Sequence, residues 1–366
     1  MMNIDKIKLL SQRYDILSED VFFISLNFYG IDANVEYPRI RFEFEPNDNV
    51  LFKHAKKRNI IRFFHAVPIR EDSPFSLSAK FDLLLFNGEV MGKVYDVHND
   101  TCDVEYTRNL GRVLNLNPVS KSNCHGCKFC HTIIQEAKDR IDIKSAEGLT
   151  LFIEKWLHDK NIHNLAEIEQ IAIVTGTFGS VLSVKDYCCL VRNLLKKYSY
   201  KNELFYFGSE VDAISLQTMG KECFPFALCY TLECFDRRED ILKSVKAQKT
   251  IQDIQKLFKI AMENKIEVNF SYVLGIDSLQ TIKKSFTEIV PHITRFPIIN
   301  IYQRHRNIDD SILDSAAHDI EYYLETRNII ESIFLETPMR PRTWENYRSL
   351  WYLSFANEEL KGNRLP

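Results

Sequence analysis

The chain of 366 residues is predicted to be an α/β protein whose central part forms a partial TIM-type (β/α)6 barrel. Between about residues 110 and 303, six short apolar runs alternate with helical stretches, and several runs end at a glycine. This alternation is typical of parallel βα units. The flanking segments have different patterns. We therefore expect an N-terminal mixed, mostly β lobe (1–108), the partial barrel (109–305) and a C-terminal helical cap (306–366).

The N-terminal lobe is predicted to contain short antiparallel strands. Residues 39–45 alternate between polar and apolar side chains with period two, as a half-buried strand does. The apolar runs at 81–86 and 89–95 are separated by Asn87 and Gly88. An Asn-Gly pair between two such runs predicts a β-hairpin.

The barrel strands and helices are expected in regular order. Strands are predicted at 113–116, 171–174, 204–207, 227–232, 268–274 and 298–302, and helices at 132–141, 185–198, 239–248, 251–264 and 279–292. Residues from about 310 onward are rich in Leu, Tyr and Trp and are expected to be helical, with breaks at Pro338 and Pro341. In a TIM-type barrel the active site lies at the carboxyl ends of the strands, so candidate site residues follow each run.

Three cysteines lie on the loop after the first barrel strand, at Cys124, Cys127 and Cys130. Three thiolates on one loop can hold three corners of an iron–sulfur cube and leave the fourth iron open to another ligand. A zinc site with His125 or His131 as fourth ligand is the alternative. The other cysteines are expected to be small buried side chains or isolated.

Composition limits the partners and the compartment. The net charge of −3 gives no electrostatic reason to expect nucleic acid, which makes a nucleic-acid partner unlikely on this ground. No apolar run approaches the roughly 20 residues that a membrane-spanning helix needs, and the first residues do not resemble a signal peptide. A cytoplasmic protein without membrane contact is expected, in which the nine cysteines do not form a disulfide framework.

The cysteine loop, with the aromatic Phe129 beside its last cysteine, resembles that of the radical S-adenosylmethionine (SAM) superfamily. The usual spacing there is C-x3-C-x2-C, whereas this loop has C-x2-C-x2-C, with Asn123 where the longer register would place a cysteine. The resemblance implies a [4Fe–4S] cluster and SAM as cofactors. It further implies that one electron, supplied by a flavodoxin or ferredoxin, cleaves SAM to a 5′-deoxyadenosyl radical that abstracts hydrogen from the substrate.

The resemblance also implies where SAM would lie along the strand ends. A Gly-Gly-Glu-type turn of the family corresponds to Thr175, Gly176 and Thr177, which lack the acid. The biotin-synthase-like members suggest further contacts at Glu233, Arg238, Gly275, Ile301 and Tyr302. Two structural alternatives remain open, an ordinary turn at residues 175–176 and a buried ion pair of Glu233 with Arg237 or Arg238. Arg304 and Arg306 would hold an anionic substrate group or belong to a solvated surface.

Three functions are compatible with these residues. The first is a radical SAM enzyme in biosynthesis that acts on a small-molecule substrate. Since no cysteine follows Cys234, a single-cluster enzyme is favoured over one with auxiliary clusters. A peptide-modifying radical SAM enzyme is the second alternative. A non-enzymatic zinc or redox-sensing binding protein is the third.

Overall fold

The computed structural model describes residues 2–48, 50–100, 106–121, 124, 126–130, 142–305 and 310–365. The predicted helix at 132–141 lies outside the described residues, as do Asn123, His125, His131 and Arg306.

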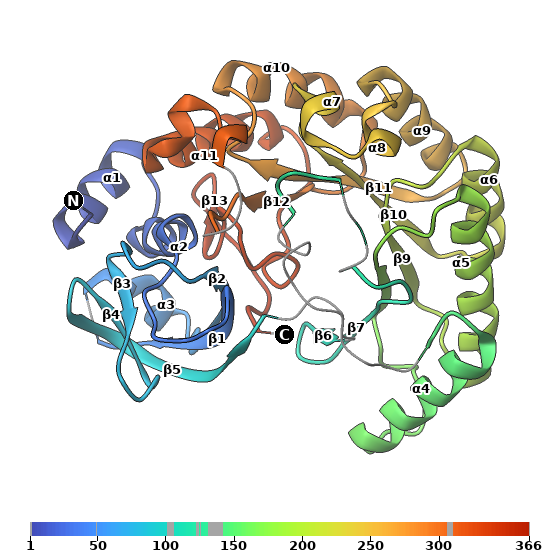
Figure 1. The fold of residues 1–366 in the computed structure, drawn as a ribbon, viewed down its shortest axis with the longest axis horizontal. Helices are drawn as coiled ribbons and strands as arrows, with labels where there is room; N and C mark the ends of the chain where they lie inside the picture. The colour runs from blue at the N-terminus through green and yellow to red at the C-terminus, as the bar shows by residue number, and fades with distance from the viewer. Residues whose placement is uncertain are drawn as a thin grey trace.

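The central sheet confirms the predicted partial barrel. Its six parallel strands lie side by side in chain order: β7 (Val113–Leu116), β8 (Gln170–Val174), β9 (Glu203–Gly208), β10 (Phe226–Glu233), β11 (Glu267–Leu274) and β12 (Ile298–Ile301). A seventh strand, β6 (Tyr106–Arg108), pairs antiparallel with β7. The sheet curls without joining its edge strands β6 and β12, so the barrel is open along one side (Figure 1).

Amphipathic helices cover the outer face of the sheet (Figure 1): α4 (Ala146–Lys160), α5 (Val181–Leu195), α6 (Ala213–Glu222), α9 (Ile251–Glu263) and α10 (Leu279–Ile289). In α9 the buried side chains of Ile254, Leu257, Phe258 and Ala261 recur at helical spacing, which gives the helix one apolar stripe. A capping box between Thr250 and Asp253 fixes its start. Helices α4 and α6 had no counterpart among the predicted elements.

The predicted helix at 239–248 is instead two short helices, α7 (Arg238–Ile241) and α8 (Ser244–Ala247). Leu242 separates them because its backbone is extended, with ψ at 152°. The predicted helices at 185–198 and 279–292 end in 3-10 turns at 196–198 and 290–292.

The N-terminal lobe combines two helices with a five-stranded antiparallel sheet in the order β2-β1-β5-β4-β3. The elements are α1 (Ile4–Tyr14), α2 (Ser18–Tyr29), β1 (Arg39–Pro46), β2 (Phe63–Pro68), β3 (Phe75–Leu77), β4 (Leu83–Phe86) and β5 (Glu89–Asn99), with a short α3 (Lys53–Lys57). The predicted hairpin joins β4 and β5. Its turn residues Asn87 and Gly88 both have positive φ, at 49° and 83°, as a type I′ turn requires.

The C-terminal extension is helical over α11 (Ile320–Phe334), after two 3-10 turns at 310–312 and 315–318. Most of the described residues after it are irregular, apart from the small hairpin of β13 (Ser354–Phe355) and β14 (Glu358–Glu359). Pro338 and Pro341, which lack a backbone donor, lie where the helix does not continue. The expectation of helix throughout this extension was therefore wrong beyond residue 334.

Residues 345–348 of this extension bridge the open side of the barrel, and we call them the closing segment. The backbone N–H of Ile301 on β12 donates to the Arg348 carbonyl at 2.9 Å. Arg108 of β6 donates to the Glu345 carbonyl at 2.7 Å. The N-terminal lobe contacts the same side, since Gln303 donates to the Ala66 carbonyl at 2.9 Å. A chamber inside the barrel is thus enclosed by three parts of the chain.

Along the described residues, no helix combines the length and the apolar character that crossing a membrane would demand.

Candidate functional site

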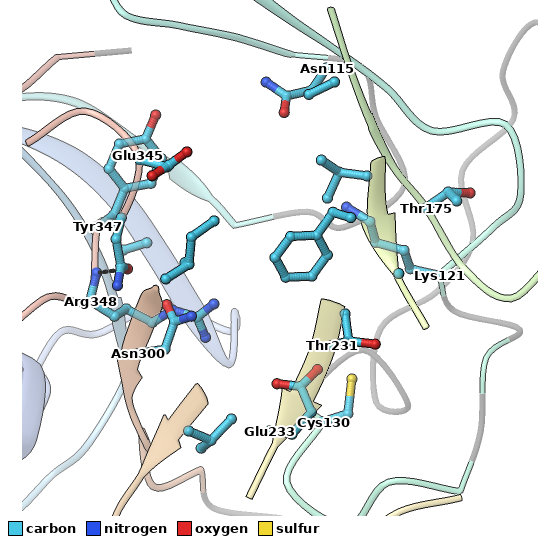
Figure 2. Close-up of a pocket in the computed structure, with 18 of the residues that line it drawn as sticks. Asn115, Lys121, Cys130, Thr175, Thr231, Glu233, Asn300, Glu345, Tyr347 and Arg348 are labelled. Atoms are coloured by element: carbon cyan, nitrogen blue, oxygen red, sulfur yellow. Dashed lines mark hydrogen bonds between the residues drawn. The ribbon is translucent and has the colours of Figure 1, made fainter. Parts of the chain in front are cut away.

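A pocket of about 330 Å³ lies inside the barrel and extends to the carboxyl ends of its strands (Figure 2). Its apolar part is formed by side chains that point inward from β8, β9 and β12 and belong to a core cluster of their own: Ala172, Val174, Phe205, Phe207 and Ile298. Its polar part comes from the loops after the strands, the N-terminal lobe and the closing segment. The volume suits a small organic molecule.

The structure brings the three cysteines of the loop to this pocket. Cys127 is buried, whereas Cys124 and Cys130 are half-buried, and all three line the wall. The loop lies against the α7–α8 region, because the Lys128 N–H donates to the Ile241 carbonyl at 2.9 Å. Gly126 permits this approach: it has φ at +109°, and a Cβ there would lie 2.7 Å from the Cβ of Lys243.

Two lysines of the α7–α8 region face the cysteine loop. The Lys243 ammonium lies 3.4 Å from the sulfur of Cys124. Burial raises the pKa of the Cys127 thiol, and the positive charge of Lys246 opposes that shift. Nearby cations favour the thiolate form, which is the form that binds metals.

The donor set of the loop fits an iron–sulfur cluster by its chemistry: three thiols on one pocket wall, with cations beside them. Among the described residues, no three His, Cys, Asp or Glu side chains converge as a ready-made set of metal ligands. The three sulfurs therefore share a wall without being gathered around one point. Phe129 also lines the pocket, next to the third cysteine.

The turn after β8 lines the pocket through Thr175, Gly176 and Thr177. The Thr175 hydroxyl accepts from the Val119 N–H at 2.8 Å, which ties this turn to the segment before the cysteine loop. Gly176 approaches that segment so closely that a Cβ would lie 2.4 Å from the Ser120 carbonyl oxygen. Glycine at this position is therefore a requirement of packing, whatever the turn binds.

A carboxylate reaches the turn after β8 from the loop that follows the next strand, β9. Glu210, two residues after β9, is 8% exposed and lines the pocket. Its carboxylate accepts from the Thr177 hydroxyl at 2.6 Å and from the N–H groups of Phe178 at 2.7 Å and Gly179 at 2.8 Å. The sequence analysis missed this residue. The sequence feature that could have identified Glu210 is its position directly after the predicted strand at 204–207, Gly208 and Ser209.

Glu233 at the end of β10 also lines the pocket, and Figure 2 shows it beside Thr231 and Cys130. Its φ is +72°, at a register shift in the pairing of β10 with β11. The Glu233 carboxylate forms a buried ion pair with Lys246 at 3.2 Å. The partner is thus a lysine of α8, and neither of the two arginines that the structural alternative proposed.

Arg238 does not line the pocket. Its guanidinium donates to the backbone carbonyls of Leu232 at 2.8 Å, Cys234 at 2.7 Å and Lys246 at 3.0 Å. It therefore holds the turn after β10 together, and its contact with the SAM carboxylate stays a prediction.

Gly275 does not line the pocket either. Its φ is +112°, and a Cβ there would lie 2.9 Å from both Leu313 Cδ2 and the Tyr323 hydroxyl. Both the positive φ and the close packing against Leu313 and Tyr323 therefore require a glycine at position 275. Ile301 and Tyr302, the expected contacts on the sixth strand, do line the pocket.

Arg304 lies outside the pocket lining, and its guanidinium contacts His318 and Asp310. The pocket instead receives four other arginines that the sequence analysis did not single out. They are Arg39 and Arg41 of β1, Arg108 of β6 and Arg348 of the closing segment, and we call them the arginine wall. They could not be read as a group from the sequence because they lie near opposite ends of the chain.

Comparisons with known proteins give structural matches only. No protein-family model and no curated protein sequence matches the chain. The fold is similar to coproporphyrinogen III oxidase (HemN) from Escherichia coli, a radical SAM enzyme, with a TM-score of 0.44 and 14% identity over 60% of this chain and 52% of that one. It is also similar to SuiB from Streptococcus suis bound to S-adenosylmethionine, with a TM-score of 0.43 and 13% identity over 64% and 48%.

A third match is the radical SAM methyltransferase TsrM from Kitasatospora setae, solved with cobalamin and a [4Fe–4S] cluster, with a TM-score of 0.36 and 11% identity over 54% and 37%. HemN and TsrM belong to the superfamily that the cysteine loop resembles. The chain spans between about a third and half of the length of these three proteins.

Proposed function

We propose that this protein is a radical SAM enzyme that acts on a small-molecule substrate. A [4Fe–4S] cluster would be held by Cys124, Cys127 and Cys130, and SAM would lie along the strand ends. When bound, these cofactors supply reductive cleavage of SAM to a 5′-deoxyadenosyl radical, which abstracts a hydrogen atom from the substrate. The proposal includes a flavodoxin- or ferredoxin-type electron donor and a cytoplasmic location.

One observation carries this proposal: three cysteines of one short loop line a single enclosed pocket at the carboxyl ends of six parallel strands. The carboxyl ends of barrel strands are where this architecture holds its active sites. Three sulfur donors leave one iron of a cubane without a protein ligand, and that iron is the position for a further ligand.

The chain's own residues would bind, orient and shield the reactants. Lys243 and Lys246 place positive charge beside the thiolates. Thr175, Gly176 and Thr177, with Ile301 and Tyr302, line the region proposed for SAM. Phe205 and Phe207 give the chamber apolar walls, which exclude water from a reactive site.

Anaerobic reconstitution with iron and sulfide tests the proposal. We expect about four iron atoms per chain, visible iron–sulfur absorption that dithionite bleaches, and 5′-deoxyadenosine when SAM and reductant are added. Cys127→Ala should lose the iron, whereas Cys189→Ala, at a half-buried cysteine outside the pocket, should retain it.

A colourless protein that holds one zinc ion would reject the proposal and favour the zinc-binding alternative. Equal iron content in the Cys127→Ala and Cys189→Ala variants would reject the assigned ligands.

A further inference from the structure

We propose that the arginine wall binds an anionic oxygen group of the substrate, a carboxylate or a phosphate, with Arg348, Arg39 and Arg41 as its principal contacts. The identification of the ligand as a substrate depends on the proposed function. The existence of an anion site in the pocket does not, because it follows from the charges and contacts of the wall itself.

Among the described residues, the wall has more cationic than acidic side chains. Its four arginines share their side of the pocket with two of the carboxylic acids in the lining, Asp100 and Glu345. Burial raises the pKa of Glu345, although the neighbouring arginines oppose this shift. The Asp100 carboxylate is shared between two guanidinium groups, those of Arg39 and Arg41.

Arg39 is 1% exposed, which is unusual for an arginine whose charge is not fully compensated. Its Nε lies 2.9 Å from Asp100, and its Nη2 donates to the Ala66 carbonyl at 3.3 Å. Its Nη1 is buried and has no hydrogen-bond partner among the described residues. A buried cationic donor without a partner is costly, and a ligand oxygen in the pocket would satisfy it.

Arg41, two residues along β1, binds the other oxygen of Asp100 and lies over the ring of Tyr106 at 5.4 Å. Arg39 and Arg41 therefore hold one carboxylate between them and both line the pocket. Asp100 thereby holds both guanidinium groups in the lining of the pocket.

Arg348 is half-buried and lines the pocket from the closing segment. Its backbone is fixed on both sides, because its carbonyl accepts from Ile301 and its N–H donates to the Asn346 side chain at 2.9 Å. Figure 2 shows its guanidinium beside Asn300, directed across the pocket toward Thr231 and Glu233. A rigid backbone with a forward-pointing guanidinium is well suited to bind an oxygen pair.

The titration behaviour of the buried groups is consistent with a positive potential. Burial, together with the charges of Arg348 and Arg41, lowers the pKa of Arg39 to about 10 against the opposing effect of Asp100. Burial, together with the charges of Arg39 and Arg348, likewise lowers the pKa of His305 to about 2. His305 is therefore neutral at physiological pH and adds no charge.

The two sides of the pocket define how a substrate would lie between them. The cysteines and the strand-end turns occupy one side of the pocket, and the closing segment with Arg348 occupies the other (Figure 2). A substrate whose anionic group contacts the arginine wall would extend its carbon skeleton over Phe205 and Phe207 toward the proposed SAM position. The wall would thereby select which hydrogen is presented.

Calorimetric titration of the full-length chain with inorganic phosphate, and separately with acetate, at fixed ionic strength tests this proposal. We expect saturable binding of at least one of the two anions, and phosphate-only binding would identify a phosphate ester as the substrate class. Arg348→Gln should weaken binding about tenfold or more. Arg348→Lys retains the charge and should weaken anion binding less. It also shows whether the loss in Arg348→Gln comes from the missing charge or from misfolding.

Arg112→Gln is the matched control, because Arg112 is exposed, pairs with Glu169 at 3.1 Å and precedes β7 at the opposite end of the barrel. It should bind like the unmodified chain. No saturable binding of either anion, or equal affinity of the Arg348→Gln and Arg112→Gln variants, would overturn the proposal.

Two further measurements separate this proposal from the proposed function. If saturating SAM displaces phosphate and acetate from the reconstituted protein, the wall serves SAM and the substrate site is rejected. If anion binding behaves as expected but no iron–sulfur cluster forms, the anion site stands and the radical SAM function fails.

Discussion

The two walls of the pocket are built in contrasting ways. The cysteine loop places its three sulfurs within seven consecutive residues. The arginine wall is assembled from β1, β6 and the closing segment, which meet only through tertiary contacts. The first wall is therefore a local property of the chain, whereas the second exists only when the N-terminal lobe, the barrel and the extension are docked together.

The largest expected effect concerns the support of the arginine wall. Arg327 of α11 is 1% exposed and pairs at 2.9 Å with Asp20 of α2, which also accepts from the N–H groups of Leu353 and Ser354. Since removal of one partner leaves a buried charge, Arg327→Met should lower the free energy of unfolding by about 3–5 kcal/mol. Urea denaturation measures this loss.

Arg13→Met is the control for this variant, because it removes a more exposed ion pair, that of Arg13 with Glu321. Its expected cost is much smaller than that of the buried pair, because solvent screens exposed charges. Similar losses in the two variants would show that docking of the extension does not depend on the buried pair.

A smaller effect is expected on the other side of the pocket. Glu210→Gln keeps the shape of the side chain but removes the charge that accepts from Thr177, Phe178 and Gly179. We expect a loss of about 1–3 kcal/mol in the free energy of unfolding, also measured in urea. The exposed Glu169→Gln provides the comparison, and equal stability of both variants would mean that the turn does not need its carboxylate.

The contrast between the walls also explains what the sequence could predict. The six barrel strands were predictable because each is a short apolar run, and α9 was predictable from its apolar stripe between Ile254 and Ala261, whereas α4 and α6 were not predicted. The cysteine loop was predictable from spacing alone. The arginine wall was not, because no local pattern distinguishes Arg39 or Arg348 from Arg304, which lies outside the pocket lining.

Arg238 and Gly275 show what position along the chain does not predict. Both occupy strand-end positions that the family resemblance marks, yet the structure uses Arg238 to bind backbone carbonyls and Gly275 to pass beneath α11. Position along the chain located the strand ends, but it could not determine the direction of a side chain after a turn. The irregular path after α11 was likewise decided by docking rather than by local propensity.

A third prediction concerns pH and the lobe that carries Arg39. His65 of β2 is fully buried among aromatic rings, and burial lowers its pKa to about 3. In the unfolded chain a histidine has a pKa of about 6.5, so the unfolded state binds a proton that the native state does not. Stability should therefore fall as pH falls below about 6.5, by about 1.4 kcal/mol per pH unit from this residue.

His65→Phe should flatten that part of the pH dependence, as measured by urea denaturation at several pH values. His158→Phe, at an exposed position, is the matched control. An unchanged slope in the His65→Phe variant would show that another group controls the acid sensitivity of the lobe.

The smallest expected effect is a change in anion binding at the arginine wall with pH. Burial raises the pKa of Tyr106, but Arg108, Lys121 and Arg41 lower it, with a net value of about 8. Above pH 8 the phenolate would form and compete for the same cations, so phosphate or acetate binding should weaken. Tyr106→Phe should retain its affinity to higher pH, and identical pH profiles of the two proteins would contradict this assignment.

The closing segment has a consequence for biogenesis. During translation, β7 through β12 leave the ribosome before residues 345–348 do, so the half-barrel exists for a time with its long side uncovered. Apolar side chains of the pocket, such as Phe205 and Phe207, are uncovered on that side until the closing segment folds across the gap. A chain that stopped before residue 345 would leave this side of the sheet exposed to water.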